Sequence, residues 1–409
     1  MKRVVVTGVG AISAIGNDWR TVRARLESGV SAVVSMPEWR KYKGLNTYLA
    51  APVPPFDVPA HYTRKATRAM GRVALMSVLA SEAALHDAGL HGHPLVTSGK
   101  LGISYGSSTG TPAAVADFGR MMINNTTEDV SATTYIRMMP HTTAVNIGVF
   151  FGITGRILTT SSACTSGSQG IGYAYETIRA GLQTAMLAGG AEELDATEAA
   201  VFDTLFATST SNDTPGTTPR PFDAGRDGLV LGEGAGTLVL EELEHARARG
   251  ARILAEIVGY GTNSDGAHVT HPKAETMAEA MRLALEAAQL DAGRIGYVNA
   301  HGTATEHGDI AESHATHAVL GGGVPVSSLK SFLGHTLGAC GALEAWMSIE
   351  MMRDGWFAPT INLEQPDPRC AALDYIVGEG RRLDAEYVMS NNFAFGGINT
   401  SLIFRRWQE

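Results

Sequence analysis

The stretch at residues 157–181 reads ILTTSSACTSGSQGIGYAYETIRAG and decides the fold class. A β-branched run comes first, a loop of small residues around Cys164 follows, and a helical pattern then runs to a glycine. A strand that passes directly into a helix is typical of α/β proteins with buried sheets. A similar order recurs at residues 324–355, VPVSSLKSFLGHTLGACGALEAWMSIEMMRDG. This likeness alone leaves internal duplication and coincidence equally open.

The same alternation of β-branched runs and helical patterns extends over the whole chain. The sequence predicts strands at residues 4–7, 101–105, 184–188, 237–241, 253–260 and 297–300. It predicts helices at residues 20–28, 71–87, 165–180, 273–289, 309–319 and 342–354. These elements favour a large α/β protein whose hydrophobic core is larger than that of one ordinary domain.

The boundary between two halves is expected near residue 250. Residues 241–252, EELEHARARGAR, carry the densest cluster of charges in the chain. Their spacing predicts a solvated helix with pairs of opposite charge. We therefore divide the chain into residues 1–250, which contain Cys164, and residues 251–409, which contain most histidines of interest.

Composition narrows the function classes. The 409 residues carry a formal net charge of −9, which argues against a general nucleic-acid binder. The three cysteines are too few and too scattered for a disulfide framework, so a reducing cytoplasm is expected. The sequence has no signal-peptide pattern and no apolar run of the roughly 20 residues that a membrane helix needs.

Cys164 has two readings from its surroundings. A free cysteine is often only a small buried hydrophobic residue. Cys164, however, follows a strand, lies among serine, threonine and glycine, and precedes a helix whose N-terminus would lower the thiol pKa. These features leave a nucleophile and a core residue as equal alternatives. Cys340 and Cys370 lack such features and are expected to be structural.

Two glycine motifs in the first half have structural explanations that we favour. TGVGAIS at residues 7–13 resembles a dinucleotide fingerprint, but Ser13 replaces its third glycine, and a tight turn would explain the glycines. GSSTG at residues 106–110 satisfies the G-x-S-x-G pattern of serine hydrolases, with Ser108 as the candidate nucleophile. A small-residue loop that lines a pocket is the simpler reading.

Histidines gather in two segments of the second half. His301 ends a predicted strand in VNAHGTATEHGDIAES, residues 298–313, and Asp309 and Glu312 fall in the first turns of the next helix, where acids are favoured. Lys330 and His335 lie in SSLKSFLGHTLGACGALEA, residues 327–345. The remaining histidines of this region, His307, His314 and His317, lack a metal-binding spacing, so no metal is expected.

These segments together resemble the β-ketoacyl-acyl-carrier-protein synthases of the thiolase fold, nearer the synthase I/II type than synthase III. The likeness covers essentially the whole chain, and its order is far more specific than any single motif. SSACTSG and GGAEEL lean toward the synthase I branch. The matching segments are MKRVVVTGVGAISAIGN (1–17), SSACTSG (161–167), GGAEEL (189–194), RPFDAGRDGLVLGEGAG (220–236), EIVGYGTNSDG (256–266), HGTATEHGD (301–309), KSFLGHTLGACG (330–341) and SNNFAFGGINTSLI (390–403).

The resemblance implies a division of labour. Cys164 would carry an acyl group as a thioester, and His301 and His335 would stabilise the enolate formed when malonyl-carrier loses CO2. Lys330 would support the histidines and pair with Glu344. The supporting positions are an oxyanion hole from the backbone N–H groups of Cys164 and Phe395, gating by Phe393 and Phe395, phosphopantetheine contacts from Thr303 and Thr305, structural support from Asp309, Glu312 and Glu344, and an acyl pocket with Thr109, Met138 and Phe202.

The expected partner is an acidic acyl carrier protein. Arg64, Lys65, Arg68 and Arg72 form a basic stretch, in which Lys65 and Arg68 match the family's carrier-docking patch. A surface helix is the simpler reading of this stretch. Residues 119–131, GRMMINNTTEDVS, carry almost no positive charge where a second patch is expected. This departure leaves open a carrier other than the standard fatty-acid one.

The resemblance implies a thiolase-like, five-layer αβαβα fold of two related halves. It implies a cytoplasmic dimer, either of identical chains or with a chain-length-factor-like homologue, without a cofactor beyond the carrier's phosphopantetheine. The expected reaction is the decarboxylative condensation of an acyl thioester with malonyl-carrier in fatty-acid or polyketide and polyene synthesis. Two rival functions remain: a non-catalytic partner subunit, and a serine hydrolase that uses Ser108. GSSTG and Ile398 depart from the commoner family pattern and leave the acyl chain open.

Overall fold

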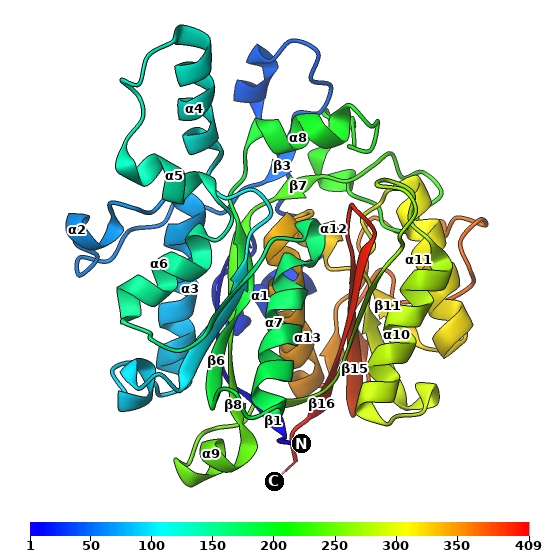
Figure 1. Cartoon of the computed structure of the whole chain (residues 1–409). Helices are drawn as coiled ribbons and strands as arrows, with labels where there is room; N and C mark the ends of the chain where they lie inside the picture. The colour runs from blue at the N-terminus through cyan, green and yellow to red at the C-terminus, as the bar shows by residue number, and fades with distance from the viewer. Residues whose placement is uncertain (409) are drawn as a thin grey trace.

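The computed structural model describes residues 1–408, and its centre is an 11-stranded sheet (Figure 1). The strand order is β13-β11-β10-β15-β16-β9-β1-β8-β6-β4-β5. The order is symmetric about the β9–β1 pair, because β1, β8, β6, β4 and β5 on one side match β9, β16, β15, β10 and β11 on the other. Each matching pair of neighbours also agrees in being parallel or antiparallel.

The strands of each half keep the same order along the chain as in their counterpart. The first half contributes β1 (Val4–Ser13), β4 (Leu101–Gly106), β5 (Ile157–Thr160), β6 (Ala185–Glu192) and β8 (Gly234–Glu242). The second half contributes β9 (Ala255–Ser264), β10 (Ile295–Asn299), β11 (Pro325–Ser327), β15 (Tyr387–Phe393) and β16 (Ile398–Arg406), with β13 (Asp374–Tyr375) at the edge.

The helices complete five layers, as the resemblance implied. In Figure 1, α3 and α6 cover the outer face of the first half's strands, and α10 and α11 cover the outer face of the second half's strands. The helices α7 and α13 lie between these two sets of strands. The bounds are α3 (Arg72–Asp87), α6 (Thr142–Phe151), α7 (Ser166–Arg179), α10 (Ala274–Ala288), α11 (Glu306–Leu320) and α13 (Cys340–Asp354). The predicted helices and strands are confirmed, with ends that differ by a few residues.

Smaller elements surround these layers. The helices are α1 (Trp19–Glu27), α2 (Arg64–Thr67), α4 (Pro112–Asn124), α5 (Ala132–Met138), α8 (Ala196–Asp203), α9 (Leu243–Ala248) and α12 (Lys330–Leu333). The 3-10 turns are η1 (Pro37–Lys41), η2 (Pro94–Thr97), η3 (Ala163–Thr165), η4 (Pro215–Thr217), η5 (Ala292–Arg294) and η6 (Leu337–Ala339). Two small sheets contain β2 (Val34–Ser35), β3 (Leu49–Ala51) and β7 (Leu231–Gly232), and β12 (Trp356–Phe357) and β14 (Arg381–Arg382).

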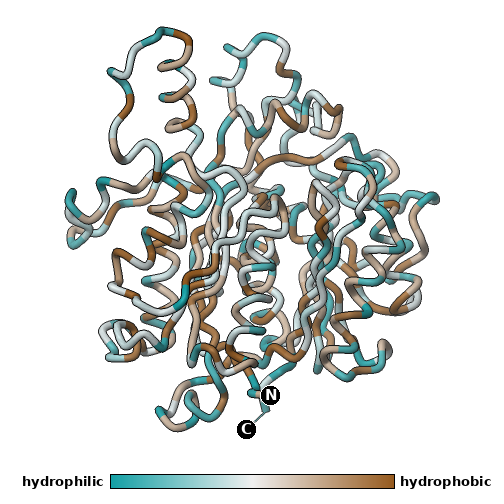
Figure 2. The backbone as a smooth tube through the Cα atoms, viewed as in Figure 1, coloured by the Kyte–Doolittle hydropathy of each residue, from teal (hydrophilic) through white to brown (hydrophobic). Residues whose placement is uncertain are grey.

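Hydrophobic residues follow the strands, while hydrophilic residues gather on outer loops (Figure 2). The central helix α13 is buried on all sides from Cys340 to Met352, because it packs on β8, on β15 and on α7. A helix at the middle layer has no solvent face, which explains why its sequence lacks a polar stripe. Within residues 1–408, no helix is long and apolar enough to span a bilayer.

Glycines let an outer helix approach the sheet closely in both halves. A Cβ on Gly10 of β1 would lie 2.1 Å from the carbonyl oxygen of Ala80 in α3. A Cβ on Gly261 of β9 would lie 2.1 Å from the carbonyl oxygen of Ala280 in α10. The turn predicted for TGVGAIS is therefore wrong: β1 continues through Ser13, and its glycines serve helix–sheet packing.

The charged segment near residue 250 also differs from its prediction. Glu241 lies in β8 and is buried, not on a solvated helix. Its carboxylate accepts hydrogen bonds from Arg249 at 2.7 and 2.8 Å and from Thr7 at 3.0 Å. Only residues 243–248 form a helix, α9. Sequence spacing showed the opposite charges but not that Glu241 belongs to a central strand. The boundary between the two halves near residue 250 stays a prediction.

Candidate active site

Cys164 lies in the turn η3, between the end of β5 and the start of α7. Ala163 before it adopts a φ of 50°, a left-handed value that is uncommon for a residue with a side chain. Ser166 holds the turn, because its hydroxyl donates to the Ala163 carbonyl at 2.8 Å and accepts from the Ser162 N–H at 3.0 Å. Cys164 is only 3% exposed and forms part of the wall of a cavity of about 560 Å³.

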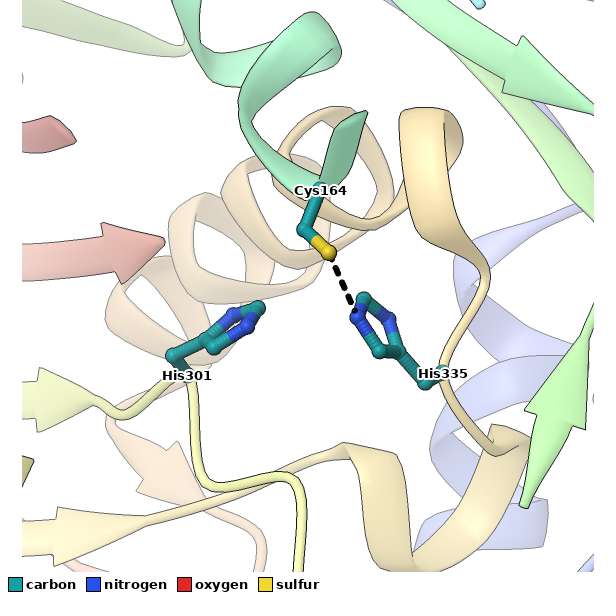
Figure 3. A group of neighbouring side chains, drawn as sticks. All are labelled: Cys164, His301 and His335. Carbon is teal, nitrogen blue, oxygen red and sulfur yellow. Dashed lines mark hydrogen bonds between the residues drawn. The ribbon is translucent and has the colours of Figure 1, made fainter. Parts of the chain in front are cut away.

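Two histidines from the second half face the thiol (Figure 3). His301 lies in the loop after β10, two residues beyond the end of the strand, and His335 lies between α12 and η6. The Nε2 atom of His335 is 3.0 Å from the Sγ atom of Cys164. The two imidazole rings are 5.1 Å apart and nearly perpendicular, at 86°. The structure thus brings together three residues that are separated by up to 171 positions in the chain.

A hydrogen bond to Nδ1 of each ring determines which ring nitrogen carries the hydrogen. The Leu337 N–H donates to Nδ1 of His335 at 3.3 Å, and the Lys330 ammonium donates to Nδ1 of His301 at 3.2 Å. With Nδ1 accepting, each neutral ring carries its hydrogen on Nε2. Burial, followed by the positive charge of Lys330, lowers the pKa of both His301 and His335 well below the usual value. Both rings are therefore neutral donors at physiological pH.

Lys330 is itself held by a buried polar network. Its ammonium donates to the Glu344 carboxylate from α13, as the resemblance implied, and the Asn392 side chain donates to the same carboxylate at 2.7 Å. Burial alone would lower the pKa of Lys330, but the Glu344 charge raises it above the usual value. The lysine therefore stays charged, and an ion pair without solvent around it fixes its position.

The thiol pKa differs from the prediction. Burial raises the pKa of Cys164 to about 11, although the Phe395 N–H and the Lys330 charge act in the opposite direction. The predicted lowering by the following helix is therefore wrong for the free enzyme, because a dry cavity disfavours the thiolate more than the helix terminus favours it. The thiol is therefore protonated at neutral pH.

The cavity extends from Cys164 past several predicted residues. The hydroxyls of Thr303 and Thr305 are 2.9 Å apart on one wall. Phe202 contacts Phe395 edge to face, with ring centroids 5.2 Å apart, and Phe393 lies near His301. The threonines and the aromatic rings therefore line the same cavity as the thiol.

Two buried acids shape the loop that carries His301. Glu312 accepts hydrogen bonds from the N–H groups of His301 and Gly302, each at 2.7 Å. Asp309 accepts from the Thr303 N–H at 3.0 Å and from the Phe222 N–H at 2.7 Å. Burial raises the pKa of Asp309 to about 6 and that of Glu312 to about 8. Both acids lie in the first turns of α11, as predicted, and act on the loop backbone.

Other predicted positions lie outside the cavity. Met138 and Thr109 are not among the described residues that line it, and the Thr109 hydroxyl donates to Glu198 at 2.8 Å. The Ser108 hydroxyl donates to Glu192 and has no histidine partner within residues 1–408. A serine hydrolase is therefore not favoured. Sequence spacing could not reveal these acids, because they come from β6 and α8.

The predicted docking residues are exposed, but the basic stretch is not one helix. Lys65 belongs to the short helix α2, Arg68 follows it, and both side chains face solvent. Arg72 begins α3 and pairs with Glu233 at 2.7 Å, so its charge is already neutralised. The prediction of a single surface helix for this stretch is therefore wrong, because residues 68–71 separate α2 from α3.

Two functional positions escaped the sequence analysis. Asn392 binds Glu344 and lies 3.4 Å from Nδ1 of His301. Glu192 joins the two halves at the site, because it accepts from the Ser107 hydroxyl at 2.7 Å and from the Gly338 N–H at 3.0 Å. The available signal was polarity inside buried strands: two asparagines in β15 and an acid, Glu192, at the end of β6.

The comparisons place the chain in the β-ketoacyl synthase family. Its residues 1–246 match the model for the β-ketoacyl synthase N-terminal domain, and residues 254–364 match that for the C-terminal domain. The chain therefore belongs to this family. The resemblance read from the motifs is confirmed.

Relatives in the family match along the full length. The chain is 38% identical to 3-oxoacyl-[acyl-carrier-protein] synthase 2 of Vibrio cholerae, with 99% of each chain covered. It is also 38% identical to synthase 1 of Escherichia coli K12, with 100% of each covered. A crystal structure of a β-ketoacyl synthase from Burkholderia phymatum STM815 superposes with a TM-score of 0.99 at 62% identity, with both chains fully covered.

More distant structures include ketosynthases in assemblies. The ishigamide ketosynthase/chain length factor is 32% identical, with a TM-score of 0.89 and full coverage of both chains. The AntDE:AntF structure, a type II polyketide synthase acyl-carrier protein in complex with its ketosynthase, is 29% identical with a TM-score of 0.88, covering 99% of this chain and 100% of that one.

Proposed function

We propose that this chain is a β-ketoacyl-acyl-carrier-protein synthase that condenses a Cys164-bound acyl group with malonyl-carrier, in fatty-acid synthesis or a related pathway. One observation carries the proposal: a cavity thiol faces the Nε2 atoms of two neutral histidines, and Lys330 is held behind them. Full-length relatives named as 3-oxoacyl synthases support the same reaction.

The first half-reaction loads the acyl group. Cys164 Sγ attacks the carbonyl carbon of an acyl-carrier thioester, the carbon–sulfur bond to the carrier breaks, and the Cys164 proton ends on the released carrier thiol. The N–H groups of Cys164 and Phe395 contact the sulfur region and are suited to bind the oxyanion. Because burial raises the thiol pKa, the thiolate forms only as the attack begins.

The second half-reaction needs donors, not a strong base. Loss of CO2 from malonyl-carrier leaves an enolate whose negative oxygen lies between the Nε2–H groups of His301 and His335. The enolate carbon then attacks the acyl-Cys164 carbonyl, a carbon–carbon bond forms, and the Cys164 thiolate leaves. Neutral histidines suit this role, because each keeps a hydrogen on Nε2 and holds it in place before charge develops.

Residues of the cavity wall and of the exposed surface support a role in binding the carrier and its phosphopantetheine arm. Thr303 and Thr305 line the approach and would hydrogen-bond the phosphopantetheine arm. Lys65 and Arg68 are exposed and would attract an acidic carrier. We place the chain in a cytoplasmic dimer, with a second copy or with a chain-length-factor homologue; the ketosynthase/chain length factor relative supports the second arrangement.

Acyl transfer tests the proposal. The protein is incubated with acyl-carrier labelled in the acyl group, digested, and the labelled peptide is identified. We expect label on Cys164, and addition of malonyl-carrier should convert it to a β-ketoacyl product on the carrier. Folded protein that never takes label would indicate a non-catalytic partner subunit instead.

A further inference from the structure

A second cluster of metal-ligating side chains lies far from the cavity, on α3 and the segments beside it. Glu82 and His86 are one helical turn apart on α3, so their side chains share a face. His91 follows the end of the helix, and its Nε2 is 3.6 Å from the Glu82 carboxylate. His61 comes from the segment before α2, and its Nε2 is 2.8 Å from the same carboxylate oxygen.

The spacing of these atoms is close to that of a tetrahedral metal. One ligand atom from each of Glu82, His86 and His91 lies within 4.8 Å of the others. Ligands about 2.0–2.2 Å from zinc are roughly 3.3 Å from one another in a tetrahedron, so contraction by up to about 1.5 Å would bring these three ligand atoms onto one ion. Rotation of exposed imidazoles can supply that movement, because His61, His86 and His91 all face solvent.

The surroundings favour a cation. Tyr62 donates to the second oxygen of Glu82 at 3.1 Å, which orients the carboxylate as outer partners of metal ligands do. The cluster lies at the C-terminal end of α3, where the helix dipole is negative. Arg252 forms an ion pair with Asp87 at 2.5 Å, so its positive charge is balanced by Asp87 and not by Glu82.

We propose that Glu82, His86 and His91 form a zinc site, which His61 joins through its contact with Glu82. Three imidazoles and one carboxylate are ligands that zinc prefers, and four ligands close a structural site without an open catalytic position. The ion would tie the segment before α2 to α3. That segment leads into the helix that carries Lys65, so zinc would order the chain next to the exposed basic residues. This proposal does not depend on the proposed condensation.

The test is zinc titration by calorimetry on the full chain, with the affinity tag removed and Cys164 alkylated. Alkylation matters because Cys164, His301 and His335 also bring ligand atoms within 4.8 Å of one another. We expect one saturable site in the parent protein. His86→Ala/His91→Ala should weaken zinc binding at least about tenfold. His314→Ala/His317→Ala is the matched control, because it removes two exposed histidines from α11, and it should bind as the parent does.

Two further measurements separate ligand loss from misfolding. Glu82→Gln keeps the shape of the side chain and one acceptor oxygen but removes the negative charge, so it should retain the parent circular dichroism spectrum and lose zinc affinity. Zinc should also slow hydrogen exchange in residues 57–63 of the parent and not in Glu82→Gln. Equal zinc affinity in the parent and in His86→Ala/His91→Ala, or no saturable binding by the parent, would overturn the proposal.

Discussion

Cys164 and Cys340 lie close to the starts of the two central helices, but only one faces the cavity. Cys164 lies inside the turn η3, one residue after the left-handed Ala163 (φ 50°), while Cys340 follows the turn η6, three residues after the left-handed Leu337 (φ 45°), and begins α13. The Sγ atom of Cys164 meets His335. The Sγ atom of Cys340 instead donates to the Cys164 carbonyl oxygen at 3.1 Å.

The difference shows that a helix N-terminus does not make a cysteine reactive. Burial raises the pKa of both thiols, to about 11 for Cys164 and well above the usual value for Cys340. What separates them is the presence of a cavity and of polarised donors beside Cys164. The first half supplies the thiol, and the second half supplies His301, His335 and Lys330, so the proposed chemistry needs both halves.

Replacing each cysteine in turn tests this asymmetry and should give the largest effect. Cys164→Ala should reduce condensation by about 10⁴-fold or more, because it removes the acyl acceptor. Decarboxylation of malonyl-carrier should survive, since both histidines remain. Cys340→Ala should reduce condensation by about tenfold at most, the value of one weak hydrogen bond. Steady-state assays of both half-reactions measure these effects, and equal losses in the two variants would remove the distinction.

The sequence predicted the helices and strands well because periodicity reports burial, while the five-layer architecture was implied by the family resemblance. The helix at residues 273–289 was predicted from its pattern and occurs as α10, Ala274–Ala288. The glycines of β1 misled the prediction, since a glycine that admits a helix looks the same in sequence as a glycine in a turn. The equivalent glycine, Gly261 in β9, lies in a strand that was predicted correctly.

The site was less predictable where it depends on depth and on distant partners. Cys164, His301 and His335 could be selected from motifs, and the structure brings them together. The pKa of Cys164 could not, because desolvation depends on every segment that closes the cavity. The place of Thr109 in an acyl pocket stays a prediction, and its partner Glu198, 89 positions away, could not be found from spacing.

The histidines provide the second test, because their proposed role is to donate at a developing charge. His301→Ala and His335→Ala should each lower malonyl-carrier decarboxylation by about 10²–10³-fold, the usual cost of one oxyanion donor. His335→Ala should also slow acyl loading, since its Nε2 is 3.0 Å from the thiol. If neither variant changes the decarboxylation rate, the second half does not supply the enolate site.

Matched glycine variants compare how the two halves pack. Gly10→Ala and Gly261→Ala should each destabilise the protein by about 1–3 kcal/mol, because each added Cβ would lie 2.1 Å from a helix carbonyl oxygen. Thermal unfolding measures the cost. Gly119→Ala is the control: its Cβ meets nothing within 4 Å, so alanine should not destabilise α4. A loss in one half only would mean that the outer layers are not equivalent.

The smallest effect is expected for Lys330, whose ammonium donates a hydrogen bond to Nδ1 of His301 at 3.2 Å. After burial, the Lys330 charge is the main influence that lowers the pKa of His301, so its removal should raise that pKa. Lys330→Met/Glu344→Gln removes both charges and leaves no unpaired buried ion. In a Cys164→Ala background, the acid limb of the decarboxylation profile should move to higher pH, because His301 gains a proton more readily. Lys100→Met, an exposed lysine, should leave the limb in place. An unchanged limb in the double variant would show that burial alone keeps His301 neutral.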